Sequence, residues 1–207
     1  MTHLYVIRHA QPDGRKPEII GLSPPDSGLS PLGVSQAQRL RDRLATTNDL
    51  HVDVLVSSPM LRAKETAEVL APALGVPVLI DERVQGIRLG ACEGLTWDEI
   101  GARFGHPETE NEPFRRFAPD ADSPASFAVR TCEGLDRLTR HYEGKTIVIV
   151  AHSETVEMTF RYFLGLPLFQ QHLPVKFGCA PTAITYWRKG SKQWTLVQFN
   201  DHMHLPE

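Results

Sequence analysis

Short runs of Val, Ile and Leu recur along the 207-residue chain and predict β-strands. Within each run the apolar residues follow one another instead of alternating with polar ones. This pattern is typical of strands that are buried on both faces of a mostly parallel sheet. The four runs lie at residues 4–7, 52–56, 76–80 and 146–150.

Segments with helical spacing of apolar residues separate these runs. We expect helices at residues 35–44, 62–74 and 127–142. Two further strands, at residues 183–187 and 194–199, flank a Gly- and Ser-containing turn and predict a hairpin that closes one edge of the sheet. Strands that alternate with helices predict an α/β fold, here a three-layer sandwich with a mostly parallel central sheet and helices on both faces.

One polar stretch interrupts this alternation. Residues 105–124 contain four prolines and many acidic residues, which disfavour a regular core element. We interpret it as part of a small lid excursion over about residues 92–124. Because 207 residues fit a single core, we expect one domain over residues 1–207.

Charge and cysteine content narrow the class of protein. A formal net charge of -3 gives no overall attraction to nucleic acid or to an anionic membrane, so we expect neither as a partner. The three cysteines have no CxxC spacing and predict neither a disulfide framework nor a zinc site. The first residues lack a long apolar signal region, and no stretch is apolar enough to span a membrane. We therefore expect a cytoplasmic protein.

Polar residues follow three of the predicted strands where each ends. Arg8 and His9 follow the first, Arg62 comes shortly after the second, and His152 follows the fourth. Ligands of open parallel sheets bind beyond the carboxyl ends of the strands, so we expect these side chains to share one crevice. Such a group of cations needs an anion, and phosphate suits it because arginine binds phosphate oxygens in pairs and a neutral imidazole can attack phosphorus. No Walker A, HExxH, GxSxG or GxGxxG motif offers a competing chemistry.

These residues belong to a longer series of motifs. Arg8-His9-Ala10 is followed by Leu29-Ser30-Pro31-Leu32-Gly33, Ser57-Ser58-Pro59, Glu65-Thr66-Ala67, Ala151-His152 and Phe199-Asn200-Asp201. In this order the motifs resemble those of the histidine phosphatase superfamily, which also contains phosphoglycerate mutases. The resemblance implies that His9 is the phosphorylated nucleophile, that Arg8 and Arg62 hold the phosphoryl oxygens and that His152 donates a further hydrogen bond to them. It also implies substrate contacts by Gln11, Ile20 and Gly21.

The family's proton donor is missing from its expected place. Members carry a glutamate four residues before the glycine of a Gly-x-Trp-Glu-Gly stretch, whereas this chain has Gly86 before Gly90-Ala91-Cys92-Glu93-Gly94. Glu82 in the same loop and Glu154, two residues after His152, are the candidate replacements, with Glu93 as a third. Each also has a structural interpretation: Glu154 as a favourable charge in the first turn of a helix, Glu82 as a solvated loop residue.

Three functions remain open at this point. The leading hypothesis is a phosphatase that forms a phosphohistidine on His9, acts on a small phosphorylated metabolite, and needs no metal and no cofactor. A mutase would return the phosphoryl group to the substrate, and a degenerate member would bind phosphorylated ligands without turnover. The sequence determines neither the substrate nor the oligomeric state, and a homo-oligomer stays open.

Overall fold

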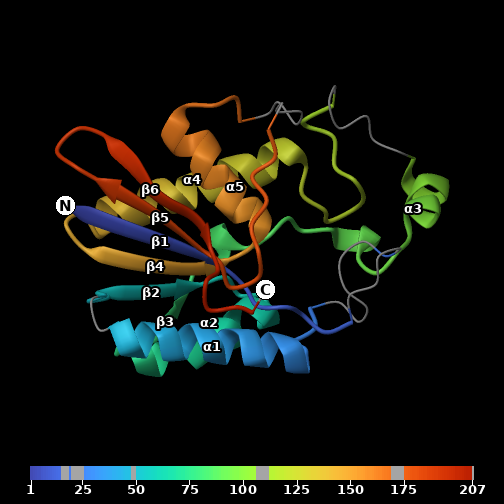
Figure 1. The fold of residues 1–207 in the computed structure, drawn as a ribbon. Coiled ribbons are helices and arrows are strands. Elements are labelled where there is room, and N and C mark those ends of the chain that lie inside the picture. Colours follow the sequence, from blue (N-terminus) through green and yellow to red (C-terminus); the bar gives the residue numbers. More distant parts are fainter. Residues whose placement is uncertain (15–18, 20–25, 48–49, 106–111, 169–174, 207) are drawn as a thin grey trace.

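The computed structural model describes residues 1–14, 19, 26–47, 50–105, 112–168 and 175–206. Its centre is a six-stranded sheet in the order β3-β2-β4-β1-β5-β6 (Figure 1). The first four of these strands are parallel, and β5 and β6 add an antiparallel hairpin beside β1, so β6 forms one edge as expected. The strands are β1 (Thr2–Arg8), β2 (Val54–Ser57), β3 (Val78–Ile80), β4 (Thr146–Ala151), β5 (Ile184–Lys189) and β6 (Trp194–Asp201).

Helices cover both faces of the sheet, which confirms the predicted three-layer α/β fold. Helices α1 (Pro31–Thr47) and α2 (Leu61–Leu74) lie on one face, and α4 (Pro124–His141) and α5 (Ser153–Leu164) lie on the other (Figure 1). The predicted helices are each found, and α1 begins four residues earlier than its apolar pattern indicated. The apolar side chains of that first turn, Leu32 and Val34, are 55% and 37% exposed, so they do not continue the buried face from which the helix was predicted.

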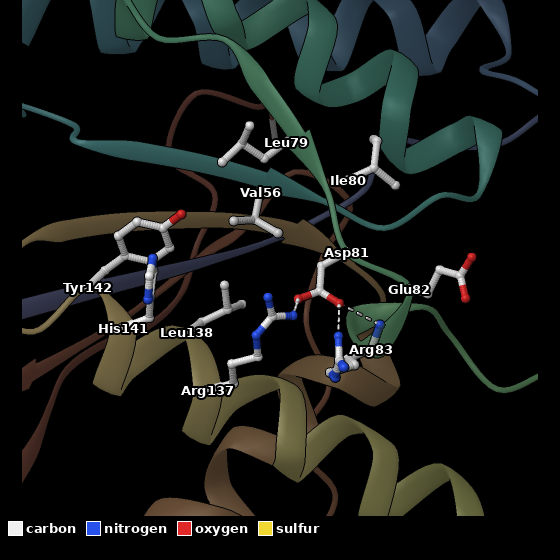
Figure 2. A pocket seen from close by; sticks show the side chains of 10 residues that line it. All are labelled: Val56, Leu79, Ile80, Asp81, Glu82, Arg83, Arg137, Leu138, His141 and Tyr142. Atoms are coloured by element: carbon white, nitrogen blue, oxygen red, sulfur yellow. Dashed lines mark hydrogen bonds and ion pairs between the residues drawn. The ribbon is translucent and has the colours of Figure 1, made fainter.

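Strand β3 differs from the prediction that all four apolar runs are strands buried on both faces. Leu79 and Ile80 are 43% and 49% exposed. The strand pairs with β2 alone and forms the second edge of the sheet, so neighbours cover only part of it. An open pocket of about 350 Å³ lies beside this edge, between β3 and the C-terminal part of α4 (Figure 2).

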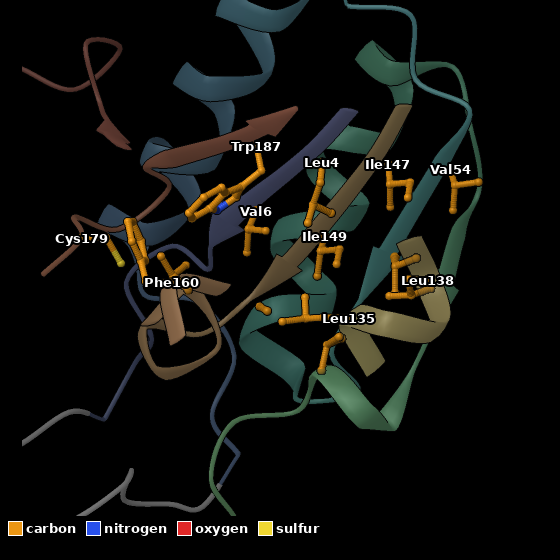
Figure 3. Packing of buried hydrophobic residues seen from close by; sticks show 14 of the residues in the cluster. Leu4, Val6, Val54, Leu135, Leu138, Ile147, Ile149, Phe160, Cys179 and Trp187 are labelled. Carbon is orange, nitrogen blue, oxygen red and sulfur yellow. The ribbon is translucent and has the colours of Figure 1, made fainter. Parts of the chain in front are cut away.

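The larger core cluster lies between the sheet and helices α4 and α5. Leu4, Ile147 and Ile149 of the central strands are fully buried there, and Trp187 of β5 packs against Phe160 of α5 (Figure 3). A second cluster lies under α1 and α2 and includes Leu40, Leu55 and Leu70. Because both faces of β1 and β4 are packed, the ends of these strands are held rigidly, and the polar residues that follow them are held with them.

The segment between β3 and α4 builds a small layer of its own. It contains two short 3-10 helices, η1 (Glu82–Val84) and η2 (Gly90–Cys92), and the helix α3 (Trp97–Phe104). Cys92, Ile100 and Ala118 are buried together in it. Gly90 has a φ of 53°, and a side chain there would overlap the Pro119 carbonyl, so only glycine fits where these two loops touch. Among the described residues before α4 in this stretch, 105 and 112–123, there is no strand or helix, as expected from its prolines and acidic residues.

Within the described ranges, none of the helices is both long enough and apolar enough to cross a membrane.

Candidate active site

The carboxyl ends of β1, β2 and β4 lie side by side and bring the predicted cationic residues together. Arg8 pairs with Ala151 in the sheet, and the backbone N–H of His9 donates to the Ala151 carbonyl at 2.8 Å. The Ser58 N–H donates to the Val150 carbonyl at 3.0 Å, which joins the end of β2 to the same place. Short connections from these ends lead to Arg62 at the start of α2 and to His152, the residue before α5.

His9 is held with one ring nitrogen facing Arg62. Its Nδ1 lies 2.7 Å from its neighbour's backbone carbonyl, that of Ala10, an oxygen that can only accept a hydrogen bond. Nδ1 must therefore carry the proton. Nε2 then has the lone pair, in agreement with the hydrogen bond that it accepts from Arg62 Nε at 3.2 Å. A neutral imidazole with this tautomer is prepared to act as a nucleophile through Nε2.

His152 lies beside His9, with the two ring centroids 5.1 Å apart in an edge-to-face arrangement. Its side chain is almost fully buried, and its Nε2 lies 2.8 Å from the Ser58 hydroxyl. Burial lowers the pKa of His152 well below its ordinary value, and the nearby His9 and Arg62 lower it further. His152 is therefore neutral in the folded protein, and it can act as a hydrogen-bond donor without adding charge to the site.

Arg8 and Arg62 each keep a buried N–H group that donates to no atom of the described residues. These groups are Arg8 Nε and Arg62 Nη1. Arg8 Nη1 donates to the Cys179 carbonyl at 2.5 Å, which fixes the guanidinium while leaving Nε for another acceptor. Because a buried N–H without a partner costs about 1 to 3 kcal/mol, two such groups at one place indicate an anion-binding site.

The electrostatic surroundings of Arg62 identify which acidic side chains face the site. Burial lowers the pKa of Arg62, and the positive charge of Arg8 lowers it further. Three negative charges raise it, with the largest effect from Glu154, then Asp26, then Glu93. Three carboxylates are thus within electrostatic range of the cationic pocket. Two of them, Glu154 and Glu93, are among the candidate acids.

A network of backbone contacts holds the loop that follows His9. The Ala10 N–H donates to the Thr66 hydroxyl at 3.1 Å, and the Gln11 N–H donates to the side chain of Gln36 at 2.9 Å. Glu65 accepts from the Leu29 N–H at 2.6 Å. Gln11 therefore lies next to the site. Ile20 and Gly21, also expected to contact substrate, lie outside the described residues.

Gly86 lies against the ring of His152. A Cβ atom on Gly86 would be 3.0 Å from His152 Cγ, so this glycine faces the pocket where the family's acid is expected. The side chain of Glu82 is 80% exposed and pairs with Arg88 at 3.9 Å. Figure 2 shows it pointing away from the other side chains of the β3 pocket. The structure brings Glu154 and Glu93 within range of Arg62 and leaves Glu82 in solvent.

Two supporting residues were not identified from the sequence. Ser58 belongs to a quoted motif, but its contact with His152 was not expected. Arg130 donates to the carbonyls of Gln85 and Gly86 and to Asp122 at 2.8, 3.1 and 2.6 Å, and so ties the Gly86 loop to α4. Contacts with backbone carbonyls depend on the path of the backbone, which the residue pattern does not encode. The sequence therefore placed Arg130 in a helix but could not predict its contacts.

Within the described part of the chain, no group of three or more His, Cys, Asp or Glu side chains is placed to hold a metal ion. The arrangement is that of a cationic anion site built around a pair of histidines. The fold and the site together define an α/β protein with a phosphate-type anion site at the carboxyl ends of its parallel strands.

Comparison with known proteins agrees with this class. The family model described as the histidine phosphatase superfamily (branch 1) matches residues 4–202. The chain belongs to this superfamily, which confirms the resemblance seen in the sequence. It is 27% identical over 219 residues to phosphoserine phosphatase 1 of Hydrogenobacter thermophilus, an alignment that covers 100% of this chain and 96% of that protein.

Solved structures show the same fold. YhfR of Bacillus stearothermophilus superposes with a TM-score of 0.81 at 25% identity, and 99% of each chain is covered. A mutant phosphoserine phosphatase from Entamoeba histolytica, in complex with phosphoserine, gives a TM-score of 0.77 at 26% identity, with 100% of both chains covered. These relatives support a phosphatase function for this chain.

Proposed function

We propose that the protein hydrolyses small phosphomonoesters through a phosphohistidine formed on His9. The observation that carries the proposal is the pair of buried N–H groups, Arg8 Nε and Arg62 Nη1, that find no acceptor in the described chain beside the nucleophilic Nε2 of His9. A phosphoryl group has the acceptor oxygens that these donors need, and its phosphorus is the atom that Nε2 would attack.

The reaction has two steps. In the first, the Nε2 lone pair of His9 forms a bond to phosphorus, the bond from phosphorus to the ester oxygen breaks, and the departing alcohol takes a proton. In the second, water attacks the phosphohistidine and gives a proton to the carboxylate that the acid became in the first step, the N–P bond breaks with its electron pair returning to Nε2, and inorganic phosphate leaves. Arg8, Arg62 and neutral His152 would donate hydrogen bonds to the phosphoryl oxygens in both steps.

Glu154 is the proton donor in this proposal. Of the three carboxylates that act on the pKa of Arg62 it has the largest effect, and its Oε2 accepts a hydrogen bond from the Ser153 hydroxyl at 3.1 Å. Glu93, the next candidate, contributes less to Arg62. Glu154 stands in the first turn of α5, directly after the N-cap residue His152, so the carboxyl group and one of the phosphoryl donors are carried by the same helix start.

Three finer points complete the proposal. The segment of about residues 92–124 would act as a lid within a single domain, because it packs as its own small layer between β3 and α4. Gln11 would contact substrate from the loop after His9. The three buried free cysteines favour a reducing compartment, in agreement with a cytoplasmic location.

Phosphate release from a set of small phosphomonoesters tests the proposal. The wild-type protein is expected to release inorganic phosphate steadily, and His9→Ala is expected to abolish release while still binding phosphate. With 3-phosphoglycerate, movement of the phosphoryl group within the molecule without phosphate release would identify a mutase. Binding without either reaction would identify a protein that only senses phosphorylated ligands.

A further inference from the structure

An apolar pocket adjoins the phosphate site on the side where Gly86 faces His152. It has a volume of about 210 Å³ and lies between α4, α5 and the loop before α4. Glu154 lines it and also acts on Arg62, while Ile87 lines it directly after Gly86. The pocket therefore shares Glu154 with the surroundings of Arg62, and its wall at Ile87 continues from the glycine that contacts His152. Its apolar walls include Phe117, Phe127, Ala128, Met158 and Leu168.

The basic side chain that lines this pocket is already hydrogen-bonded within the protein and is not arranged to bind an anion. Among the described residues that line it, Arg161 is the one basic residue, and its side chain is only 6% exposed. Its Nε and Nη2 both donate to Glu157, at 3.0 and 2.9 Å, and its Nη1 donates to the Pro167 carbonyl at 2.7 Å. Glu157 balances this charge, so the described lining offers no unpaired cation to a substrate carboxylate. A carboxylate placed there would lose its water without gaining an ion pair, which is costly.

The apolar walls indicate what the pocket accepts. Phe127, Ala128 and Met158 are buried members of one packed cluster, so this wall is preformed. An apolar cavity of about 150 Å³ is large enough to bind benzene, so a pocket of about 210 Å³ admits a group of that size. Burying one apolar group of this kind is worth about tenfold or more in specificity.

We infer that this pocket, lined by Glu154 and by the apolar side chains of α4 and α5, receives the alcohol part of the substrate and selects monophosphate esters of apolar alcohols that carry no carboxylate. The inference rests on the proposed function and names its substrate class. It separates this chain from the relative that was crystallised with phosphoserine, whose amino acid part carries a carboxylate.

The test compares esters of primary alcohols, so that the leaving groups are chemically similar. Benzyl phosphate is measured against glycerol 3-phosphate, which is polar and uncharged in its alcohol part, and against phosphoserine and 3-phosphoglycerate, which carry carboxylates. We expect kcat/KM for benzyl phosphate to exceed that for glycerol 3-phosphate by about tenfold or more, and the two carboxylates to be poorer still.

Two variants change the size of the pocket in opposite directions. Ala128→Leu fills it and is expected to lower the benzyl to glycerol ratio of kcat/KM, whereas Met158→Ala enlarges it and is expected to raise the ratio for a bulkier naphthylmethyl ester relative to benzyl. Val129→Leu is the matched control, because Val129 follows Ala128 in α4, is 43% exposed and does not line the pocket. The control is expected to keep the wild-type ratio.

The outcomes separate the inference from the function on which it rests. Three results would overturn the inference: equal kcat/KM for all four esters, higher kcat/KM for the two esters with carboxylates, or ratios that stay unchanged in both pocket variants. If phosphate is still released steadily in these cases, the phosphatase function remains intact. No release from any ester, together with no phosphohistidine, would overturn the proposed function itself.

Discussion

Nε of Arg62 lies 3.2 Å from Nε2 of His9, so the free protein has a hydrogen bond on the nitrogen that would attack phosphorus. The bond orients the imidazole, with Ala10 holding the opposite nitrogen at 2.7 Å. It also places the Arg62 guanidinium where the oxygens of an incoming phosphoryl group would lie. In the proposed mechanism those oxygens would take over the Arg62 donors and free the lone pair on Nε2, so that anion binding would activate the nucleophile.

Replacing Arg62 by lysine should preserve its charge and remove this coupling. Lysine is a point charge without the planar set of N–H donors, so it can neither orient Nε2 nor bind two phosphoryl oxygens together. We expect Arg62→Lys to lower kcat/KM by about 100- to 1000-fold, the usual effect of losing one transition-state donor. Arg137→Lys is the control, since Arg137 is 62% exposed and pairs with Asp81 beside β3. Equal activity of both variants would contradict the role given to Arg62.

The proton donor can be identified by varying the leaving group. Glu154→Gln should lower kcat for an alkyl phosphate by about 100-fold or more, because an alkoxide leaves poorly without an acid. The same variant should lose little activity on 4-nitrophenyl phosphate, whose phenolate leaves without help. Glu82→Gln is the matched control and should keep wild-type rates on both esters, because its carboxyl group is in solvent. Loss of equal size on both esters would indicate a structural role for Glu154.

Adding one methyl group at Gly86 should disturb His152. The new Cβ would lie 3.0 Å from the imidazole, closer than ordinary contact, so the ring or the loop must shift. Arg130 donates to the Gly86 carbonyl and Ser58 contacts the His152 ring, so a shift of either would strain a hydrogen bond. We expect Gly86→Ala to cost about 1 to 3 kcal/mol of stability and to raise KM for phosphate esters, as measured by thermal unfolding and steady-state kinetics. An unchanged KM would mean that His152 does not touch the phosphoryl group.

Much of the fold and part of the site followed from the sequence for identifiable reasons. Buried strands such as β1 and β4 are continuous apolar runs, and polar residues at their ends are confined to one edge of a parallel sheet, so Arg8, His9 and His152 could be placed together. Strand β3 has the same composition, but its position at an edge depends on strand order, which the apolar pattern does not encode. The contact of Gly86 with His152 and the carbonyl contacts of Arg130 depend on backbone paths and were equally hidden.

The C-terminal segment should make stability depend on pH. His204 lies 2.8 Å from the Thr182 hydroxyl, and burial lowers the pKa of His204 from 6.5 to about 4. The unfolded chain takes up a proton below about pH 6.5 while the folded chain does not, so the free energy of unfolding should fall as the pH drops from 6.5 to 4.

The variant His204→Gln isolates this contribution. Its amide can still donate to Thr182 and does not titrate, so its stability should fall less over the same pH range. Because His204 is only half-buried, we expect a difference on the order of 1 kcal/mol, measured by urea unfolding at pH 7 and pH 4.5. Burial keeps His152 neutral in both proteins, so His152 contributes equally to the pH dependence of their stability. Identical pH dependence of the two proteins would show that His204 is not held neutral.

Direct detection of the phosphorylated residue tests the central claim. The protein is mixed with a phosphomonoester, quenched in alkali within milliseconds, where phosphohistidine survives, and its peptides are examined by mass spectrometry. We predict one phosphoryl group on the peptide that contains His9, formed and lost at rates that match phosphate release, and absent in His9→Ala. Steady phosphate release without a phosphorylated His9, or a phosphoryl group on another residue, would contradict the account.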